Sequence, residues 1–186
     1  MKLDILAFGA HPDDVELSCS GTLALEISRG KTAGIIDLTR GEMGTRGTAE
    51  TREAEAQKAA GIMGVKIREN LGFKDALFTN DEDHKREVIK VLRKYQPDVV
   101  FCNAIKDRHI DHARASTLVS EACFLSGLQK YKTEINGNEQ EKWRPKRVYH
   151  YIQWYDIEPD FVVDISSTIE TKIQAVKAYK TQFYDP

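Results

Sequence analysis

Short apolar runs alternate with longer amphipathic stretches through most of the chain. Branched and aromatic side chains are concentrated in four runs, which we interpret as strands: residues 3–8, 32–38, 65–71 and 98–102. The stretch after each run has helical spacing or helical composition, over residues 13–29, 48–63, 81–95 and 112–128. Strands that alternate with helices at this rhythm are typical of a parallel, doubly wound sheet.

The last third of the chain is less regular. Residues 130–144 are polar and predict an exposed loop, whereas residues 146–154 alternate aromatic and polar side chains, as a half-buried strand does. Residues 161–165 predict a further strand, and Ser167 and Glu170 predict a capping box for the last helix. No repeat or change of composition marks a boundary. We therefore expect one Rossmann-like α/β domain, with a mostly parallel sheet flanked by helices.

Composition agrees with a folded enzyme domain. The 186 residues are 41% hydrophobic and 30% charged, which is enough for one substantial core. The formal net charge of −2 gives no overall attraction to nucleic acid or to an anionic membrane, so neither is an expected partner. Cys19, Cys102 and Cys123 fit reduced core thiols, and no run approaches the ~18 apolar residues of a membrane helix. These features predict a cytoplasmic protein.

The first apolar run ends in a polar turn, His11-Pro12-Asp13-Asp14, which Glu16 follows. Catalytic groups of open α/β sheets collect at such turns, beyond the carboxyl ends of the strands. Pro12 fixes its own φ and keeps His11 out of the helical region. An imidazole and two carboxylates this close together could bind zinc or a similar ion and supply a base. They could also cap the following helix and interact with its dipole.

A second polar cluster, Arg108-His109-Ile110-Asp111-His112, follows the apolar run at 98–102. If both runs are strands of one parallel sheet, the two clusters can meet at its carboxyl edge. Together they supply three metal ligands and spare acid–base groups. This favours the catalytic interpretation of the first turn.

These residues resemble the LmbE/PIG-L superfamily of zinc-dependent N-acetylglucosamine deacetylases. The resemblance rests on His11-Pro12-Asp13-Asp14 with Glu16 and on His109-Ile110-Asp111-His112, with support from residues 39–47, 51–52, 70–71 and 179–184. Within the superfamily the chain is most similar to the group that acts on N-acetylglucosaminyl malate in bacillithiol biosynthesis. The likeness spans residues 1–186, which lack a C-terminal segment that relatives usually have, and Thr181 replaces a serine common in relatives. It implies an amino-sugar conjugate as the substrate and a homo-oligomeric enzyme.

The resemblance also implies a role for the matching residues. His11, Asp14 and His112 match the family's metal ligands, for Zn²⁺ or, in the cell, Fe²⁺, and Asp13 matches its general base. We expect His109 to stabilise the oxyanion or to protonate the leaving amine. Asp111 would then hold the ring of His109 or that of His112.

Substrate contacts are expected from the glycine-rich loop at residues 40–47 and from the helix after it. The candidates are Glu42, Arg46 and Arg52, of which Arg52 offers a planar fork suited to the carboxylates of malate. A solvated helix arginine is the alternative for Arg52. The same residues are compatible with deacetylation of another N-acetylated molecule, with a metal-dependent phosphoesterase and with a sugar-binding module. A free carboxylate beside three metal ligands favours hydrolysis over binding alone.

Overall fold

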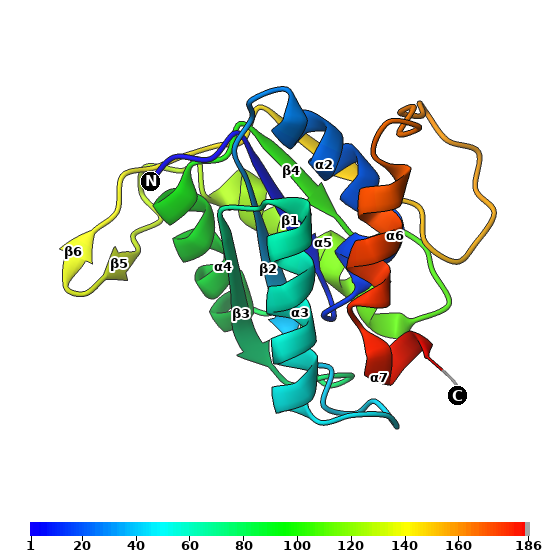
Figure 1. Cartoon of the computed structure of the whole chain (residues 1–186). Coiled ribbons are helices and arrows are strands. Elements are labelled where there is room, and N and C mark those ends of the chain that lie inside the picture. Colours follow the sequence, from blue (N-terminus) through cyan, green and yellow to red (C-terminus); the bar gives the residue numbers. More distant parts are fainter. Residues whose placement is uncertain (185–186) are drawn as a thin grey trace.

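Parallel strands form the central sheet of the computed structural model, which describes residues 1–184 (Figure 1). Within this part of the chain the sheet has five strands in the order β3-β2-β1-β4-β7. They span Ile5–Gly9 (β1), Ala33–Thr39 (β2), Ile67–Phe73 (β3), Val99–Cys102 (β4) and Arg147–His150 (β7). The strand order reverses at β1, which creates a switch point between β1 and β4. The predicted parallel α/β fold is confirmed.

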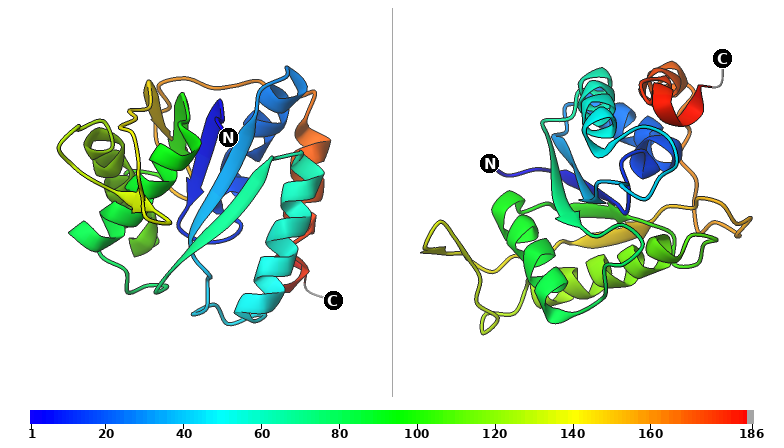
Figure 2. Two further views of the ribbon diagram at one scale, coloured as in Figure 1. Left: turned by 90° about the vertical axis from the view of Figure 1, so that its left-hand side faces the viewer. Right: turned by 90° about the horizontal axis from the view of Figure 1, so that it is seen from below.

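Helices cover both faces of the sheet (Figure 2). One layer contains α1 (Asp14–Ser18), α2 (Ser20–Ser28), α3 (Ala49–Met63), α6 (Ile169–Lys177) and α7 (Lys180–Phe183). The other contains α4 (Glu82–Tyr95) and α5 (Ile110–Leu125). Each layer buries its own apolar cluster, because successive side chains of a strand point to opposite faces. Leu6 and Phe8 of β1 belong to one cluster, and Ile5 and Ala7 belong to the other.

The first predicted helix, residues 13–29, is divided into α1 and α2 at Cys19, so the prediction of one continuous helix was wrong. The Ser20 hydroxyl donates a hydrogen bond to the Glu16 carbonyl oxygen (2.6 Å). A hydroxyl that bonds to the preceding turn competes with the helical backbone and bends the helix. The break allows α1 to direct the Glu16 side chain into the interior, where it is fully buried.

Residues 161–165 form no strand, so this prediction was wrong, although the structure describes the whole segment. Phe161 and Val162 are 55% and 81% exposed, and the Phe161 ring packs edge-on against Tyr149 of β7 at 5.1 Å. Side chains rather than backbone hydrogen bonds therefore attach this segment to the edge strand. The strand predicted over residues 146–154 is shorter than expected and spans only Arg147–His150.

The loop predicted at residues 130–144 contains a small hairpin. Its strands are β5 (Glu134–Ile135) and β6 (Asn138–Glu139), which pair in antiparallel fashion. Asn136 and Gly137 between them have φ values of 53° and 75°. These left-handed conformations are typical of a tight hairpin turn, and Asn-Gly is a preferred sequence for it.

The last helix also differs from its prediction. It is divided into α6 and α7, and the predicted capping box of Ser167 and Glu170 is replaced by Thr168, which precedes α6 without a side-chain cap. The Thr168 hydroxyl instead donates to the Gly21 carbonyl oxygen (2.8 Å) and ties α6 to α2. None of the helices within residues 1–184 is long and apolar enough to cross a membrane.

Helix α6 contacts the C-terminal end of α1 through Lys172. Lys172 Nζ donates hydrogen bonds to the carbonyl oxygens of Glu16, Leu17 and Ser18, at 3.2, 2.6 and 3.2 Å. These carbonyl groups have no partner within the short helix, so the ammonium group satisfies them. The hydroxyl of Tyr179 donates to Glu16 Oε1 (3.2 Å) from the same side. The helix that begins with Asp14 is therefore fixed by the C-terminal part of the chain.

Candidate active site

The carboxyl ends of β1 and β4 place the two polar clusters in one cavity of about 720 Å³. His11, Asp13, Asp14, His109 and His112 all line this cavity. Asp13 has a φ of 112°, which L side chains rarely adopt. Backbone strain of this kind is concentrated at functional sites, where the surrounding structure maintains it.

Asp14 lies between two of the histidines. Its Oδ1 is 3.1 Å from His112 Nε2, and its Oδ2 is 3.6 Å from His11 Nδ1. Two ligands of one tetrahedral zinc ion are about 3.4 Å apart, so each separation suits a pair of ligands. The two contacts use different oxygens of Asp14, and in the described chain His11, Asp14 and His112 do not form a group whose donor atoms all lie within 4.8 Å of one another. The backbone N–H of His11 donates to Asp14 Oδ2 (2.9 Å) and fixes the carboxylate within the turn.

Two further carboxylates lie on the other side of His11. His11 Nε2 is 3.0 Å from Asp75 Oδ1 and 3.3 Å from Asp111 Oδ2. Asp111 also accepts a hydrogen bond from Arg114 Nη1 (2.6 Å). The Asp111 carboxylate is thus directed at His11, and not at the two histidines beside it in the sequence, where we had expected it.

His112 is oriented by a carboxylate outside the predicted set. Asp107 Oδ1 lies 2.9 Å from His112 Nδ1 and accepts a hydrogen bond from the His109 backbone N–H (3.0 Å). This leaves His112 Nε2 facing Asp14, which is the way carboxylates commonly orient a metal-binding imidazole. The His109 ring stacks on His112, with the ring centroids 4.9 Å apart, and meets His11 edge-on at 4.6 Å.

The pKa values of the cluster are shifted in opposite directions. Burial raises the pKa of Asp13 to about 7, and the negative charge of Asp14 adds to the effect. Burial opposes the ionisation of Asp14, but hydrogen bonds from His11 and His112 hold its pKa well below the usual range. Burial lowers the pKa of His109, and the positive charges of His11 and His112 lower it further. Near neutral pH Asp14 is ionised, and Asp13 is able to accept a proton.

The donor atoms fit a divalent cation. Imidazole nitrogens together with a carboxylate oxygen form a ligand set that both zinc and ferrous iron accept. In the described chain, one group of donor atoms within 4.8 Å of one another comes from His11, His109 and His112, and another from His11, Asp75 and Asp111. Burial alone would lower the pKa of His11, but hydrogen bonds to the surrounding carboxylates raise it to about 12. The surroundings of His11 therefore favour positive charge.

Arg52 projects from α3 toward Asp13 and is only 6% exposed. Its Nη1 donates to the Gly41 carbonyl oxygen (2.9 Å). Its Nη2 donates to the Pro12 carbonyl oxygen (2.7 Å) and to Asp13 Oδ2 (3.2 Å). The guanidinium thus joins the glycine-rich loop to the turn that carries Asp13.

The other two predicted substrate residues lie on the loop itself. Glu42 Oε1 accepts a hydrogen bond from the Asp75 backbone N–H (2.9 Å), which places Glu42 beside the carboxylates around His11. Arg46 lies at the exposed end of the loop, where its Nη1 donates to the Tyr184 carbonyl oxygen (3.3 Å). Arg46 is absent from the lining of the catalytic cavity, whereas Arg52 forms part of it.

Four polar residues of the site were not found from the sequence: Asp75, Asn103, Asp107 and Gln153. Each lies just beyond the carboxyl end of a strand, after β3, β4 or β7. The rule that identified His11 applies equally to these positions, because every strand of a parallel sheet ends at the same edge. Asp75, Asn103 and Gln153 lack a neighbouring histidine in the same turn, so no local motif distinguished them, whereas Asp107 stands directly before the Arg108–His112 cluster.

A family model described as GlcNAc-PI de-N-acetylase (PIG-L) matches residues 6–123, which include both polar clusters. The chain belongs to the PIG-L family. Membership makes it an enzyme of a de-N-acetylase family and confirms the resemblance seen in the sequence.

Two relatives of this PIG-L chain are named for deacetylation. The chain is 29% identical to diacetylchitobiose deacetylase from Thermococcus kodakarensis over 191 residues, which is 96% of this chain and 70% of that protein. It is 24% identical to the probable N-acetyl-alpha-D-glucosaminyl L-malate deacetylase 2 of Bacillus anthracis, over 96% of this chain and 81% of that protein.

Solved structures share the fold of this PIG-L chain. The conserved protein TT1542 from Thermus thermophilus matches with a TM-score of 0.91 and 42% identity, over 97% of this chain and 80% of that one. GalB, the 4-carboxy-2-hydroxymuconate hydratase from Pseudomonas putida, matches with a TM-score of 0.84 and 25% identity, over 98% and 80%.

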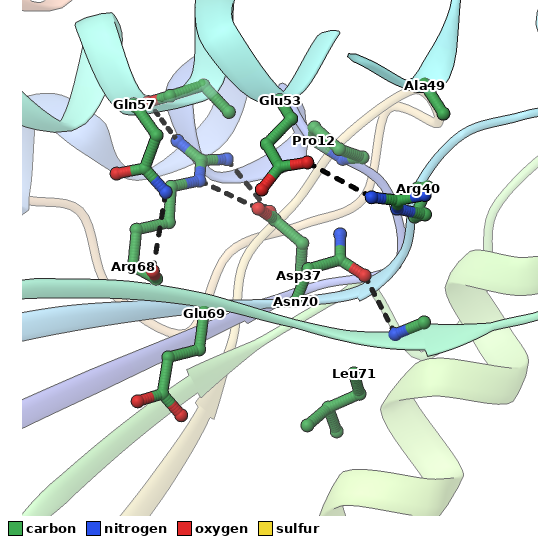
Figure 3. Close-up of a pocket in the computed structure, with 12 residues that line it drawn as sticks. Pro12, Asp37, Arg40, Ala49, Glu53, Gln57, Arg68, Glu69, Asn70 and Leu71 are labelled. Atoms are coloured by element: carbon green, nitrogen blue, oxygen red, sulfur yellow. Dashed lines mark hydrogen bonds and ion pairs between the residues drawn. The ribbon is translucent and has the colours of Figure 1, made fainter.

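A second cavity, of about 400 Å³, lies beyond Pro12 between α3 and the strands β2 and β3 (Figure 3). Its polar side chains are engaged with the protein itself. Arg40 pairs with Glu53 (3.1 Å), and Gln57 Nε2 donates to the Arg68 carbonyl oxygen (3.4 Å). This cavity therefore offers a ligand fewer unused groups than the cavity that contains the histidines.

Proposed function

We propose that this chain hydrolyses the N-acetyl group of an N-acetylglucosamine conjugate, with a divalent ion, Zn²⁺ or Fe²⁺, held by His11, Asp14 and His112. The observation that carries the proposal is the position of Asp14 between the two histidines, in a cavity that Asp13 also lines. The names of the family and of the two relatives support the reaction type.

The side chains have complementary tasks in such a reaction. A divalent ion held by His11, Asp14 and His112 would lower the pKa of a water molecule and would polarise the acyl oxygen. Asp13, whose pKa is about 7, accepts a proton from the attacking water and can return it to the leaving amine. His109 Nδ1 accepts a hydrogen bond from the Asp111 backbone N–H (3.2 Å), so the ring proton is on Nε2, where it can be donated to the oxyanion. The products are acetate and a free amino sugar.

His112→Ala tests the metal ligands. The purified variant should retain only a small fraction of the wild-type metal content, because two ligands rarely hold a catalytic ion tightly. His84→Ala is the matched control, since His84 bonds to Asp81 at the start of α4, outside the cavity. Metal content is measured by atomic absorption. Equal content in the wild type and both variants would remove His112 from the site.

We further propose that the conjugate carries a carboxylate, as N-acetylglucosaminyl malate does, and two arginines line the cavity that would receive it. Arg52 is buried and donates to three protein oxygens. Arg108 is exposed, and its guanidinium lies 4.8 Å from the centre of the Trp154 ring. Arg108 can pair with an incoming anion without giving up hydrogen bonds to the protein, which Arg52 would have to do. The geometry therefore favours Arg108 over Arg52 as the contact for the carboxylate.

The values of kcat/KM for N-acetylglucosaminyl malate and plain N-acetylglucosamine separate the two arginines. If Arg108 binds the carboxylate, Arg108→Ala should lose roughly 10- to 150-fold on the malate conjugate alone, the value of one charge-assisted bond. Arg52→Ala should then reduce turnover of both substrates, because Arg52 contacts the base. The opposite pattern would assign the carboxylate to Arg52, and equal small losses in every case would exclude malate recognition by either residue.

The likeness to GalB supports a second candidate, hydration of a carbon–carbon double bond. Such a reaction needs a base and an activated water molecule, which the same cluster supplies. Parallel assays should decide between the two reactions. One follows amine release from N,N'-diacetylchitobiose and N-acetylglucosaminyl malate, and the other follows the loss of ultraviolet absorbance of 4-carboxy-2-hydroxymuconate. Activity in the second assay alone would replace the deacetylase proposal.

A further inference from the structure

Hydrogen-bond donors from three parts of the fold surround the Asp14 carboxylate. Its Oδ2 accepts from the His11 backbone N–H (2.9 Å) and from Asn103 Nδ2 (3.0 Å). Its Oδ1 accepts from Gln153 Nε2 (3.0 Å) and lies 3.1 Å from His112 Nε2. Because Asp14 is only 3% exposed, these contacts take the place of water.

The other partners of the two amides fix their orientation. Asn103 Oδ1 accepts from the Ala10 backbone N–H (2.9 Å), so its Nδ2 faces Asp14 and Gln153. Gln153 Oε1 accepts from Asn103 Nδ2 (3.0 Å) and from the Ala104 backbone N–H (3.3 Å), so its Nε2 faces Asp14. Turning either amide over would bring oxygen against oxygen and N–H against N–H. Only one arrangement satisfies every group.

Trp154, the residue after Gln153, helps to orient His112, which is a second candidate metal ligand. The Trp154 backbone N–H donates to Asp107 Oδ2 (2.9 Å), and Asp107 Oδ1 lies 2.9 Å from His112 Nδ1. Residues 153 and 154 follow the edge strand β7, which pairs with β4, the strand that leads to Asn103. One two-residue segment therefore restrains both Asp14 and the carboxylate that orients His112.

We propose that Gln153 is a positioning residue of the metal centre, which together with Asn103 holds the Asp14 carboxylate ready for a divalent cation. The inference rests on the proposed function, because it requires Asp14 to be a metal ligand. Gln153 acts through Asp14 and needs no contact with the reacting atoms. Outer partners of metal ligands typically change metal affinity or activity 10- to 100-fold, so the effect is measurable without substrate.

Gln153→Met tests the proposal, because methionine keeps the length of the side chain and removes both hydrogen-bonding groups. Metal-free protein is titrated with Zn²⁺ in competition with a chelating dye. The dissociation constant should rise about 10- to 100-fold while the circular dichroism spectrum and Tm stay close to those of the wild type. Gln153→Ala is a second variant without apolar bulk. Gln174→Met is the matched control, since Gln174 lies on the exposed side of α6 and bonds to Glu170 (2.7 Å).

Each outcome decides one question. A wild type that fails to bind zinc stoichiometrically would overturn the proposed metal centre and this inference with it. A wild type that binds zinc, with both Gln153 variants within twofold of its dissociation constant, would overturn the positioning role alone. A collapse of Tm in both variants, with Gln174→Met unaffected, would make Gln153 a residue of the fold and would also overturn that role.

Discussion

Two groups of buried charges differ in how their charges are balanced. In the first, Arg68 donates to both oxygens of Asp37 (2.7 and 2.8 Å) and to Glu16, and the exposed fractions of the three side chains are 1, 3 and 0%. In the second, the carboxylates around His11 and His112 line an open cavity. We call the first group the closed cluster, because its own arginine neutralises its carboxylates, although Asp37 and Arg68 line the smaller cavity. We call the second group the open cluster, because it combines carboxylates with imidazoles around the larger cavity.

The difference shows what distinguishes a structural cluster from a functional one. A guanidinium is permanently charged and presents only N–H donors, so it can neutralise carboxylates but cannot bind a metal ion. An imidazole offers a lone pair to a cation when it is neutral. Burial and charge alone do not separate the two clusters. The presence of imidazoles among the carboxylates does, because a neutral imidazole can bind a metal ion and a guanidinium cannot.

The largest effect is expected from Asp13→Asn, which removes the base from the open cluster and keeps the shape of the side chain. kcat should fall by ~10² to 10⁴ while bound metal and Tm are retained. The measurements are amine release and metal content of the same preparation. Loss of the metal would instead make Asp13 a ligand, and near-normal kcat would remove it from the reaction.

A large effect of a different kind is expected from Arg68→Met in the closed cluster. The substitution leaves Glu16 and Asp37 buried without their cation, and breaking such a pair costs about 3 to 5 kcal/mol of unfolding free energy. Urea unfolding measures the loss. The control is Arg40→Met, which removes the exposed pair with Glu53 and should cost about 1 kcal/mol or less. Equal losses of unfolding free energy in the two variants would mean that the buried pairs of Arg68 stabilise the protein no more than the exposed pair of Arg40 does.

Adding a metal ion should distinguish the two clusters, because the ion is expected to bind only to the open cluster. Zn²⁺ at about 100 times its dissociation constant stabilises the folded protein by ~2.7 kcal/mol, which raises Tm by roughly 5 to 10 °C. The increase should disappear in His112→Ala and persist in Arg68→Met. An increase of the same size in His112→Ala would place the stabilising metal elsewhere.

The smallest effect is expected for the three cysteines, because neither cluster should lower the pKa of a thiol. Burial raises the pKa of Cys19 to about 12 and that of Cys123 to about 12, and it holds the pKa of Cys102 well above its usual range. A thiol reagent at pH 8 should therefore modify the native protein slowly and all three cysteines rapidly in guanidinium chloride. Rapid modification of the native protein would contradict their burial as neutral groups.

The parts of the fold that could be predicted from the sequence are those with a local cause. The apolar run at residues 3–8 and the stripe of Val88, Ile89 and Leu92 correspond to β1 and α4, because a buried strand and an amphipathic helix each leave a periodic pattern. The break at Cys19 could not be predicted this way. The Ser20 hydroxyl that bonds to the Glu16 carbonyl oxygen leaves no periodic pattern, and Arg68, which the Glu16 side chain meets in the interior, lies far along the chain.

The residues of the site also divide into those that belong to a local motif and those that do not. The polar clusters at residues 11–14 and 109–112 are short motifs, and both line the catalytic cavity. Asp75 and Gln153 contribute only through their position in space, since a lone aspartate or glutamine in a loop has no distinctive neighbours, whereas Asp107 adjoins the second polar cluster in the sequence. The orientation of Asp111 toward His11 depends on Arg114 and on the loop after β3, and neither is apparent from spacing.

The contacts that Lys172 and Tyr179 make with α1 join a segment of the chain to one that is synthesised later. The turn at residues 11–14 is synthesised before Gln153, which bonds to Asp14, and before Lys172, which bonds to the carbonyl groups at the end of α1. A nascent chain therefore carries the motif long before it possesses the site. Under the proposed function, firm capture of the metal ion would be deferred until these later residues have packed against α1.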